Sequence, residues 1–229
     1  MNSRDNSLPN AQLAELYRQR FKGLGEYRFE VWKRLVTEFF EPQLMRSIES
    51  VLDLGAGHGE FISHSSAPKR MAMDLNPDMA EILADTGIVT FQHECTTSWP
   101  IPPESLDVVF SSNLLEHLPS KDAVELTVRH AFEAIKPGGR IILLGPNVRY
   151  VPGLYWDYWD HHIPLTERSV AELLWLTGFD VTTMIPRFLP YSMSGRRPPP
   201  PWTVSVYLKM PILWRLLGKQ FLVVGEKPK

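Results

Sequence analysis

Seven short apolar segments recur between residue 50 and the end of the chain, and stretches with helical spacing of apolar residues separate most of them. Strands that alternate with helices in this way are typical of a doubly wound α/β sheet, in which helices cover both faces of a mostly parallel sheet. The predicted strands cover residues 50–55, 69–75, 88–93, 106–112, 140–145, 179–185 and 221–227. The predicted helices cover residues 60–65, 77–86, 121–135 and 166–177, and Thr166 is a candidate N-cap for the last of them.

Helical spacing of apolar residues also runs through residues 11–45, before the first strand, and predicts two amphipathic helices there. We therefore expect an N-terminal helical cap over residues 1–48 and an α/β domain over residues 49–229. Two stretches interrupt the alternation within that domain, at residues 147–164 and 187–217. Long loops in such sheets usually carry function, so we expect both insertions to lie on the substrate side.

The second insertion joins a basic, proline-rich loop to an apolar helix at residues 203–217, bent at Pro211. This helix also carries Lys209 and Arg215, a combination compatible with peripheral contact to a membrane surface. Core packing is the commoner role of an apolar helix of this length, so both interpretations stay open.

The composition limits the partners and the setting of the chain. Its 229 residues hold 26 acidic and 24 basic side chains, and a net charge of −2 supplies no general attraction for nucleic acid. The single cysteine, Cys95, excludes an internal disulfide and favours a reducing compartment. The N-terminus lacks the apolar core of a signal peptide, and no run approaches the ~20 apolar residues that a transmembrane helix needs. We therefore expect a cytoplasmic protein without a transmembrane segment.

The strongest local motif is VLDLGAGHGEF at residues 51–61, where a buried strand leads into Gly55, Gly57 and Gly59. Glycine adopts left-handed turn angles and leaves room for a ligand to approach the backbone closely. Asp74 follows at the end of the next predicted strand, where a carboxylate can accept hydrogen bonds from ribose hydroxyls. Together these residues predict a site for a cofactor that contains adenosine.

The spacing also helps to identify the cofactor. A dinucleotide fingerprint requires its third glycine at position 60, which is Glu60 here. A phosphate-binding P-loop requires a lysine, but residues 51–61 contain no lysine or arginine. A cofactor with a positive sulfonium and no phosphate suits a loop flanked by Asp53 and Glu60. These features favour S-adenosylmethionine.

Four segments in order, VLDLGAGHGEF, AMDLNPDM, SWPIPPESLDVVFSSNLLEHL and AIKPGGRIILLGPN, resemble the successive motifs of class I S-adenosylmethionine-dependent methyltransferases. The resemblance covers residues 50–147 and is to the broad group that includes ubiquinone-biosynthesis and many glycan-modifying enzymes. It implies a Rossmann-like sheet of seven strands, mostly parallel with an antiparallel last strand. It also implies S-adenosyl-L-homocysteine as the product of the cofactor.

The same resemblance implies roles for residues at the carboxyl ends of the strands. The glycines would line the methionine and ribose portions, Asp74 would bind the ribose and Leu75 would pack beside the adenine. Asn113 would lie at the methionine end of the cofactor. Cys95 stands where the pattern often has an aspartate that contacts the adenine amino group. Glu94 or a backbone group would then supply that contact. The implied cofactor-binding residues are Asp53, Gly55, Ala56, Gly57, Gly59, Asp74, Leu75, Cys95 and Asn113.

Three histidines are candidates for a general base. His161 and His162 follow an aromatic run in the first insertion, and a neutral imidazole can take a proton from a hydroxyl as its oxygen attacks a methyl group. His117 recurs near the active site in the group that the chain resembles. Each of the three is also compatible with a core or capping role, as are many histidines.

The aromatic run and its adjacent carboxylates suggest a hydroxylated ring as the acceptor. Arg187, with Arg196 and Arg197, is a candidate to hold a phosphate or carboxylate. The candidate substrate-binding residues are Asn147, Tyr155, Trp156, Asp157, Asp160 and Arg187. The His and Asp residues form no recognised metal motif, so we expect no resident metal ion.

These features together predict O-methylation of a sugar or glycoconjugate hydroxyl. One alternative is methylation of a lipid, a quinone or another aromatic small molecule, and another is a cofactor-binding protein without catalysis. A nucleic-acid substrate is not expected, because SSNLLEHL stands after the fourth strand where base-amino enzymes usually carry Asn-Pro-Pro-Tyr or Asp-Pro-Pro-Tyr. The sequence does not predict the oligomeric state.

Overall fold

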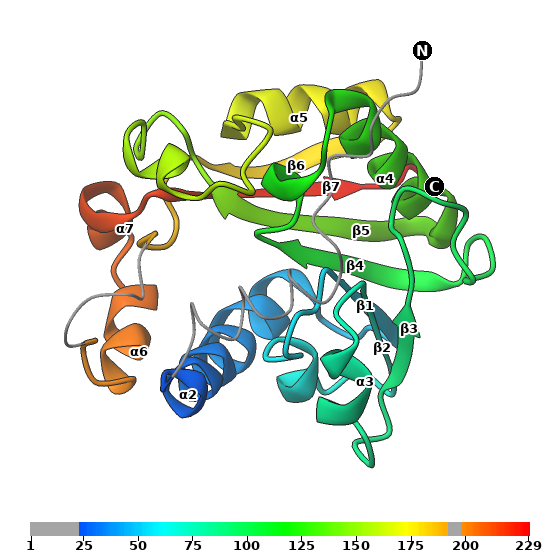
Figure 1. Cartoon of the computed structure of the whole chain (residues 1–229), viewed down its shortest axis with the longest axis horizontal. Helices are drawn as coiled ribbons and strands as arrows, with labels where there is room; N and C mark the ends of the chain where they lie inside the picture. The colour runs from blue at the N-terminus through cyan, green and yellow to red at the C-terminus, as the bar shows by residue number, and fades with distance from the viewer. Residues whose placement is uncertain (1–22, 192–197) are drawn as a thin grey trace.

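The computed structural model describes residues 23–191 and 198–229. Its centre is a seven-stranded sheet with the strand order β3-β2-β1-β4-β5-β7-β6 (Figure 1). The strands are β1 (Ser50–Leu54), β2 (Lys69–Asp74), β3 (Val89–Gln92), β4 (Leu106–Ser112), β5 (Ile135–Pro146), β6 (Asp180–Ile185) and β7 (Gln220–Glu226). Strands β1 to β5 pair in parallel, whereas β7 is antiparallel to both β5 and β6. All seven predicted strands and the antiparallel last strand are confirmed.

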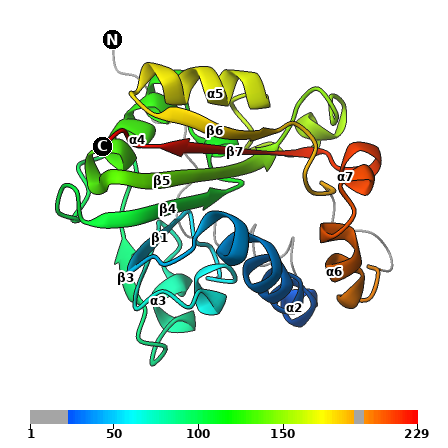
Figure 2. The same cartoon turned by 180° about the vertical axis from the view of Figure 1, so that it is seen from behind.

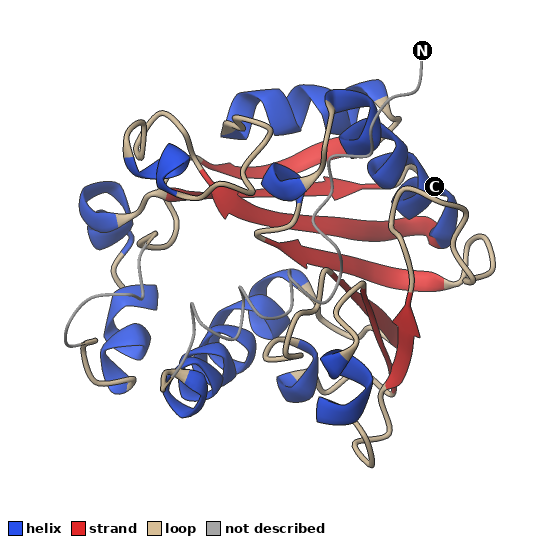
Figure 3. Cartoon of the chain, viewed as in Figure 1, coloured by secondary structure: helices blue, strands red, loops and turns tan. Residues whose placement is uncertain are grey.

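Helices cover both faces of this sheet (Figure 3). They are α2 (Gly25–Leu35), η1 (Val36–Leu44), η2 (Ile62–His64), α3 (Asp78–Ile82), η3 (Leu115–His117), α4 (Lys121–Ala134), η4 (Leu154–Asp157), α5 (Glu167–Leu176), α6 (Trp202–Leu208) and α7 (Pro211–Leu217). The hydrophobic cluster on one face contains buried residues of α2, η1, α3 and α6, and the cluster on the other contains those of α4 and α5. The core therefore forms two apolar layers with the sheet between them.

Several predicted helices differ from the observed ones in extent. The helix predicted at residues 60–65 is a single 3-10 turn, η2, because it follows directly on the positive φ of Gly59. The apolar helix predicted at residues 203–217 is two helices, since Pro211 begins α7 and cannot continue the hydrogen bonding of α6. The N-cap at Thr166 is confirmed, and its side chain accepts a hydrogen bond from the backbone NH of Ser169.

Only part of the predicted N-terminal cap falls within the described residues. There α2 runs directly into the π-helix η1, which contains Pro42. Proline lacks a backbone NH and so removes one α-helical hydrogen bond, which favours a widened turn at this point. The remainder of the predicted cap, residues 1–22, lies outside the described residues. None of the described helices combines the length and the apolar character needed to cross a membrane.

The topology fixes where a ligand can approach. Strand β1 lies between β2 and β4. The chain leaves β1 toward β2 and one edge of the sheet, and it leaves the neighbouring β4 toward β5 and the other edge. In open α/β sheets, ligands bind outside the carboxyl ends of the strands at this kind of switch point. The glycine motif after β1 and the segment after β4 meet at this edge, and we describe the candidate site there.

Candidate functional site

The glycine loop turns sharply after β1. Gly55, Gly57 and Gly59 have φ values of 74°, 56° and 72°, all in the left-handed region. A Cβ atom at Gly59 would lie 2.5 Å from Leu83 Cδ2, whereas a Cβ atom at Gly57 would meet nothing within 4 Å. Gly59 therefore permits close packing within the protein, and Gly57 presents open space above the backbone, as a cofactor cradle requires.

Asp74 lies at the end of β2 beside this loop. Its Oδ2 atom accepts a hydrogen bond of 2.7 Å from the backbone NH of Gly57, and its Oδ1 atom accepts one of 2.7 Å from the NH of Asn76. These two hydrogen bonds fix the carboxylate next to the open space above Gly57. The ribose-binding role of Asp74 stays a prediction, and the half-buried Leu75 follows immediately.

Asp53 lies in β1, two residues before Gly55, and its side chain is buried. The residue is 3% exposed, and its carboxylate accepts a hydrogen bond from the backbone NH of Ile62. Burial and the charges of Glu60 and Asp74 raise its pKa well above the ordinary value. Glu60 is itself paired with Arg28 of α2 at 2.7 Å, so the N-terminal helix is tied to the cofactor loop.

Cys95 lies in the core after β3, and burial raises the pKa of its thiol to about 12. Thr127 donates a hydrogen bond to its Sγ atom at 3.6 Å, and Trp99 Nε1 donates one to its backbone oxygen at 2.9 Å. The thiol is therefore a packing group. The adjacent Glu94, which is half-buried, carries the polar atoms of this turn and accepts two hydrogen bonds from Thr96.

The segment after β4 flanks the glycine loop on the side away from Asp74, because β1 lies between β2 and β4. Asn113 has a left-handed φ of 53°, is exposed, and donates its backbone NH to the Leu144 oxygen at 2.9 Å. Asparagine tolerates this conformation better than most residues do. Leu114 packs directly over Gly55, where an added Cβ atom would lie 3.0 Å from Leu114 Cβ. The glycine loop and the 3-10 helix η3 are thus in contact.

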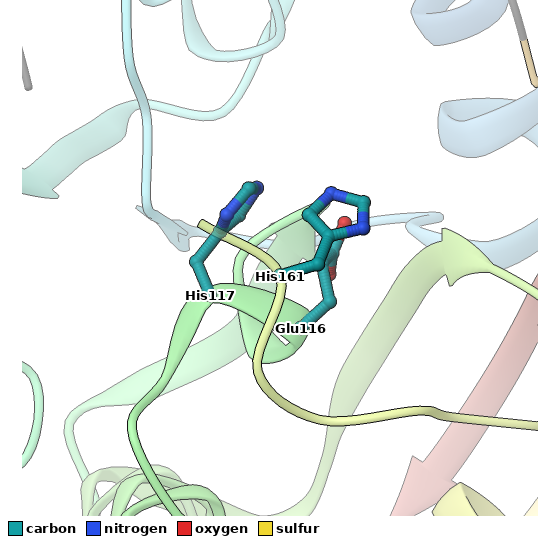
Figure 4. Close-up of side chains that lie close together, drawn as sticks. All are labelled: Glu116, His117 and His161. Carbon is teal, nitrogen blue, oxygen red and sulfur yellow. The ribbon is translucent and has the colours of Figure 1, made fainter. Parts of the chain in front are cut away.

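A cluster of titratable side chains follows Leu114. Figure 4 shows Glu116 and His117 of η3 close to His161 of the first insertion. The rings of His117 and His161 are 4.8 Å apart, centre to centre. His117 Nδ1 lies 3.2 Å from Asp160 Oδ2 and 3.0 Å from the Asp160 backbone oxygen. The backbone oxygen of Glu116 accepts the NH of His162 at 2.8 Å, which joins the two segments.

The electrostatics of the cluster follow from its burial. Desolvation raises the pKa of Glu116, which is 2% exposed. Burial on its own would lower the pKa of His117, but the hydrogen bond to Asp160 and the charges of Glu116 and Asp160 outweigh it and raise this pKa. Because Nδ1 faces two oxygens, it carries the hydrogen, and Nε2 is the atom that can accept a further proton.

Glu116, His117 and His161 also offer one ligand atom each within 4.8 Å of one another. Two imidazoles and a carboxylate are a donor set that suits transition metal ions, so these residues could hold one. The sequence analysis named both histidines but missed Glu116. The signal that could have identified it was an acidic residue directly before His117 in a segment that continues a buried strand.

The other residues of the aromatic run differ in burial. Tyr155 is fully buried and its hydroxyl donates to the Ile163 backbone oxygen. Trp156, Asp157 and His162 have exposed side chains. Of the residues predicted for catalysis and substrate binding, His117, His161 and Asp160 are therefore the ones brought together.

Two predicted substrate residues have structural roles. Asn147 is completely buried, and its Nδ2 atom donates to Glu167 Oε2 at 2.6 Å and to the Pro186 backbone oxygen at 2.9 Å. The Arg187 guanidinium donates to the backbone oxygens of Gly218 at 2.8 Å and Leu216 at 2.7 Å, at the end of α7. These contacts engage the amide nitrogen of Asn147 and two of the three guanidinium nitrogens of Arg187. Arg196 and Arg197 lie outside the described residues.

Comparisons with known proteins agree with this geometry. Residues 24–184 match the family described as "Methyltransferase domain". A probable S-adenosylmethionine-dependent methyltransferase of Mycolicibacterium smegmatis is 28% identical over 187 residues, which are 79% of this chain and 70% of that protein. A ubiquinone/menaquinone biosynthesis C-methyltransferase of Vibrio parahaemolyticus is 28% identical over 156 residues, which are 62% of this chain and 58% of that protein. The chain therefore spans less than two thirds of the quinone enzyme.

A likeness of fold extends over nearly the whole chain. The crystal structure of a SAM-dependent methyltransferase from Archaeoglobus fulgidus superposes with a TM-score of 0.67 at 20% identity, covering 93% of this chain and 99% of that one. At this identity the likeness concerns the fold.

Proposed function

The chain belongs to the class I S-adenosylmethionine-dependent methyltransferases, and from this premise we propose that it methylates a ring hydroxyl whose proton passes to His117. The acceptor that we favour is a hydroxyl of a sugar or glycoconjugate. The observation that carries the proposal is the His117–Asp160 pair, held beside buried Glu116 where the segment after β4 meets the glycine loop. This is the side of the sheet on which a bound cofactor would present its methyl group.

The residues of the loop fit S-adenosylmethionine. The space above Gly57 is open, the Asp74 carboxylate is fixed beside it, and residues 51–61 carry no lysine or arginine that would repel a sulfonium. The bound cofactor supplies a methyl group that is already activated by its positive sulfur. The task of the protein is therefore mainly to hold the acceptor oxygen in line with that group and to exclude water.

The cluster after β4 supplies the proton chemistry. As the acceptor oxygen forms its bond to the methyl carbon, the bond from that carbon to sulfur breaks, and the hydroxyl proton passes to His117 Nε2. Asp160 orients the ring through Nδ1 and stabilises the imidazolium that results. The negative charge of the neighbouring Glu116 favours the same protonated state.

A second acceptor class is supported by a separate observation. The relatives from Vibrio are described as ubiquinone/menaquinone biosynthesis C-methyltransferases, so a quinone-type ring is the second candidate. A ring carbon activated by a neighbouring hydroxyl would use the same proton acceptor. Both candidates need a ring held beside His117, and they differ in whether the methyl group ends on oxygen or carbon.

The test is formation of S-adenosylhomocysteine with sugar-containing acceptors and with hydroxylated quinone precursors, followed by mass and NMR assignment of the product. His117→Gln should lower kcat by roughly 10²- to 10⁴-fold while the affinity for S-adenosylmethionine is kept. His162→Gln is the matched control, since His162 is exposed and should leave kcat unchanged. Full activity of the His117 variant would contradict the proposal, and cofactor binding without turnover on any acceptor would favour a non-catalytic protein.

A further inference from the structure

The end of the molecule formed by α6, α7 and η4 carries an unusual share of exposed apolar side chains. Nine of the seventeen large hydrophobic residues that are exposed in the described part of the chain lie in residues 154–159 and 202–217. The most exposed tryptophans of this group are Trp159 at 88%, Trp202 at 59% and Trp156 at 55%. We call residues 154–159 and 202–217 together the docking face.

The two segments of the docking face belong to one surface. Figures 1 and 2, seen from opposite sides, both place the yellow-green segment that follows β5 beside α7, with α6 next to it. The Arg187 guanidinium donates to backbone oxygens at the end of α7 and lies 4.8 Å from the centre of the Tyr150 ring, four residues before η4. The NH of Asn147 also donates to the Lys219 oxygen at 2.9 Å.

The inner sides of α6 and α7 pack against the rest of the protein. Leu208 of α6 is buried in the core, and Trp214 of α7 packs against Phe188 and donates its Nε1 hydrogen to the Tyr207 oxygen at 2.9 Å. Ile212, Leu216 and Leu217 of α7 are 56%, 65% and 53% exposed. These three side chains are therefore largely unused for packing within the described residues, and exposed apolar side chains gathered on neighbouring segments mark a candidate site of interaction.

The docking face itself carries two basic side chains and one acidic one, and the nearby Glu38, which accepts a hydrogen bond from Ser205 of α6, is paired with Arg34. The described residues 181–191 and 198–225 contain four basic side chains and no acidic one, although the whole chain carries more acidic than basic residues. Lys209 and Arg215 are exposed on α6 and α7 themselves. The exposed Asp157 of η4 offsets only part of this charge. A positive surface with exposed apolar groups complements an anionic partner that also has an apolar interior.

We propose that the docking face binds the surface of an anionic lipid bilayer. Tryptophan favours the headgroup level, isoleucine and leucine favour the acyl boundary, and lysine and arginine pair with anionic headgroups. Two seven-residue helices are too short to span a bilayer and lie in its interface. Because η4 precedes His161 in the same insertion, the docked protein would present its acceptor side to the membrane. An acceptor with a lipid anchor follows from this, and that last step rests on the proposed function.

The test is co-sedimentation of the full chain, without cofactor or acceptor, with vesicles of phosphatidylglycerol and of phosphatidylcholine. We expect binding to the anionic vesicles that weakens as salt is added, and much weaker binding to the neutral ones. The double variant Trp159→Ser/Leu216→Ser should bind at least tenfold more weakly. Its matched control is Trp175→Ser/Leu176→Ser, which removes a tryptophan and a leucine that are 70% and 59% exposed on α5, and should bind like the wild type.

A second pair of variants tests the charge. Lys209→Gln/Arg215→Gln should weaken anionic binding by roughly fivefold for each charge removed. The control Lys121→Gln/Arg168→Gln removes two exposed charges elsewhere and should have no such effect. Thermal unfolding curves confirm that each variant is folded.

Absence of wild-type binding to the anionic vesicles, or equal losses in the controls, would overturn the proposal. Self-association that is lost in the Trp159/Leu216 variant, without vesicle binding, would make the face an interface between copies of the chain. Since no cofactor is present, these outcomes are independent of whether the chain transfers methyl groups.

Discussion

The Nδ1 atom of His117 lies 3.2 Å from Asp160 Oδ2, although the two residues are 43 positions apart in the chain. This pairing joins the segment after β4 to the first insertion, and it makes a prediction about pH. Because the pKa of His117 is raised, the protonated and inactive form persists above the ordinary histidine value of about 6.5. The rate of methyl transfer should therefore fall as the pH drops through this raised pKa.

Asp160→Asn tests the origin of that pH dependence. The substitution removes the carboxylate that raises the pKa of His117, so burial should then lower it and move the acidic limb of kcat/KM to lower pH. Rate profiles between pH 5 and 9 for the wild type, Asp160→Asn and the control His162→Gln measure the shift. A limb that stays in place in Asp160→Asn would contradict the pairing of His117 with Asp160 as the cause.

Asp53 predicts how stability depends on pH. Its pKa is raised in the folded state, so the folded protein binds this proton more tightly than the unfolded chain does. The contribution of Asp53 to the free energy of unfolding is thus most favourable at low pH, and is lost as the pH rises from about 3.9 through the raised pKa. Asp53→Asn has no carboxylate to ionise at this position. The free energy of unfolding of this variant, relative to that of the wild type, should therefore increase with pH. Urea unfolding between pH 4 and 8 measures the difference, and parallel curves would refute the assignment.

Two glycines of the loop have different expected roles: Gly59 permits close packing, and Gly57 leaves room for the cofactor. Gly59→Ala combines a left-handed φ with a contact of 2.5 Å to Leu83, and should cost about 2–4 kcal/mol of stability. Gly57→Ala meets open space, and should cost only about 1–2 kcal/mol of backbone strain. It should nevertheless weaken S-adenosylmethionine binding strongly, because its methyl group occupies the proposed cradle. Urea unfolding and calorimetry measure the two effects, and unchanged affinity in folded Gly57→Ala would count against the cradle.

The proton-acceptor role of His117 predicts activity without a metal ion. Protein treated with a chelator and then dialysed should keep its full rate, because His117 accepts the proton directly while Asp160 orients its ring. The same assay with added Zn²⁺ or Mn²⁺ provides the comparison. Loss of activity on chelation, restored by one of these ions but not in Glu116→Gln, would instead make Glu116, His117 and His161 a metal site.

The sequence predicted the sheet well because its signals are local. Each strand is a short apolar run bounded by glycine, proline or polar turn residues, and the left-handed glycines after β1 follow directly from the motif. Helix extents were less accurate where a positive φ or a proline shortened the helix, as at Gly59 and Pro211. The end of such an element depends on one residue, which periodicity over a longer window does not resolve.

The candidate site was predicted less completely because it depends on long-range contacts. The partners of Asn147 and Arg187, at Glu167 and Gly218, are 20 and 31 residues away, so their structural roles left no trace in local sequence. Asp160 was predicted to bind substrate, and its carboxylate lies beside His117, which is 43 positions away in the chain. Burial of Glu116 depends on how the first insertion folds back over η3, which the sequence pattern does not encode.

The central claim is that the crevice beside Asp74 binds S-adenosylmethionine, and calorimetric titration tests it most directly. The wild type should bind S-adenosylmethionine and S-adenosylhomocysteine, but not NAD. Asp74→Ala should weaken both by about 10- to 100-fold through loss of charged hydrogen bonds, whereas Glu81→Ala, an exposed acid on α3, should have no effect. Absence of binding to the wild type, or a preference for NAD, would contradict the account.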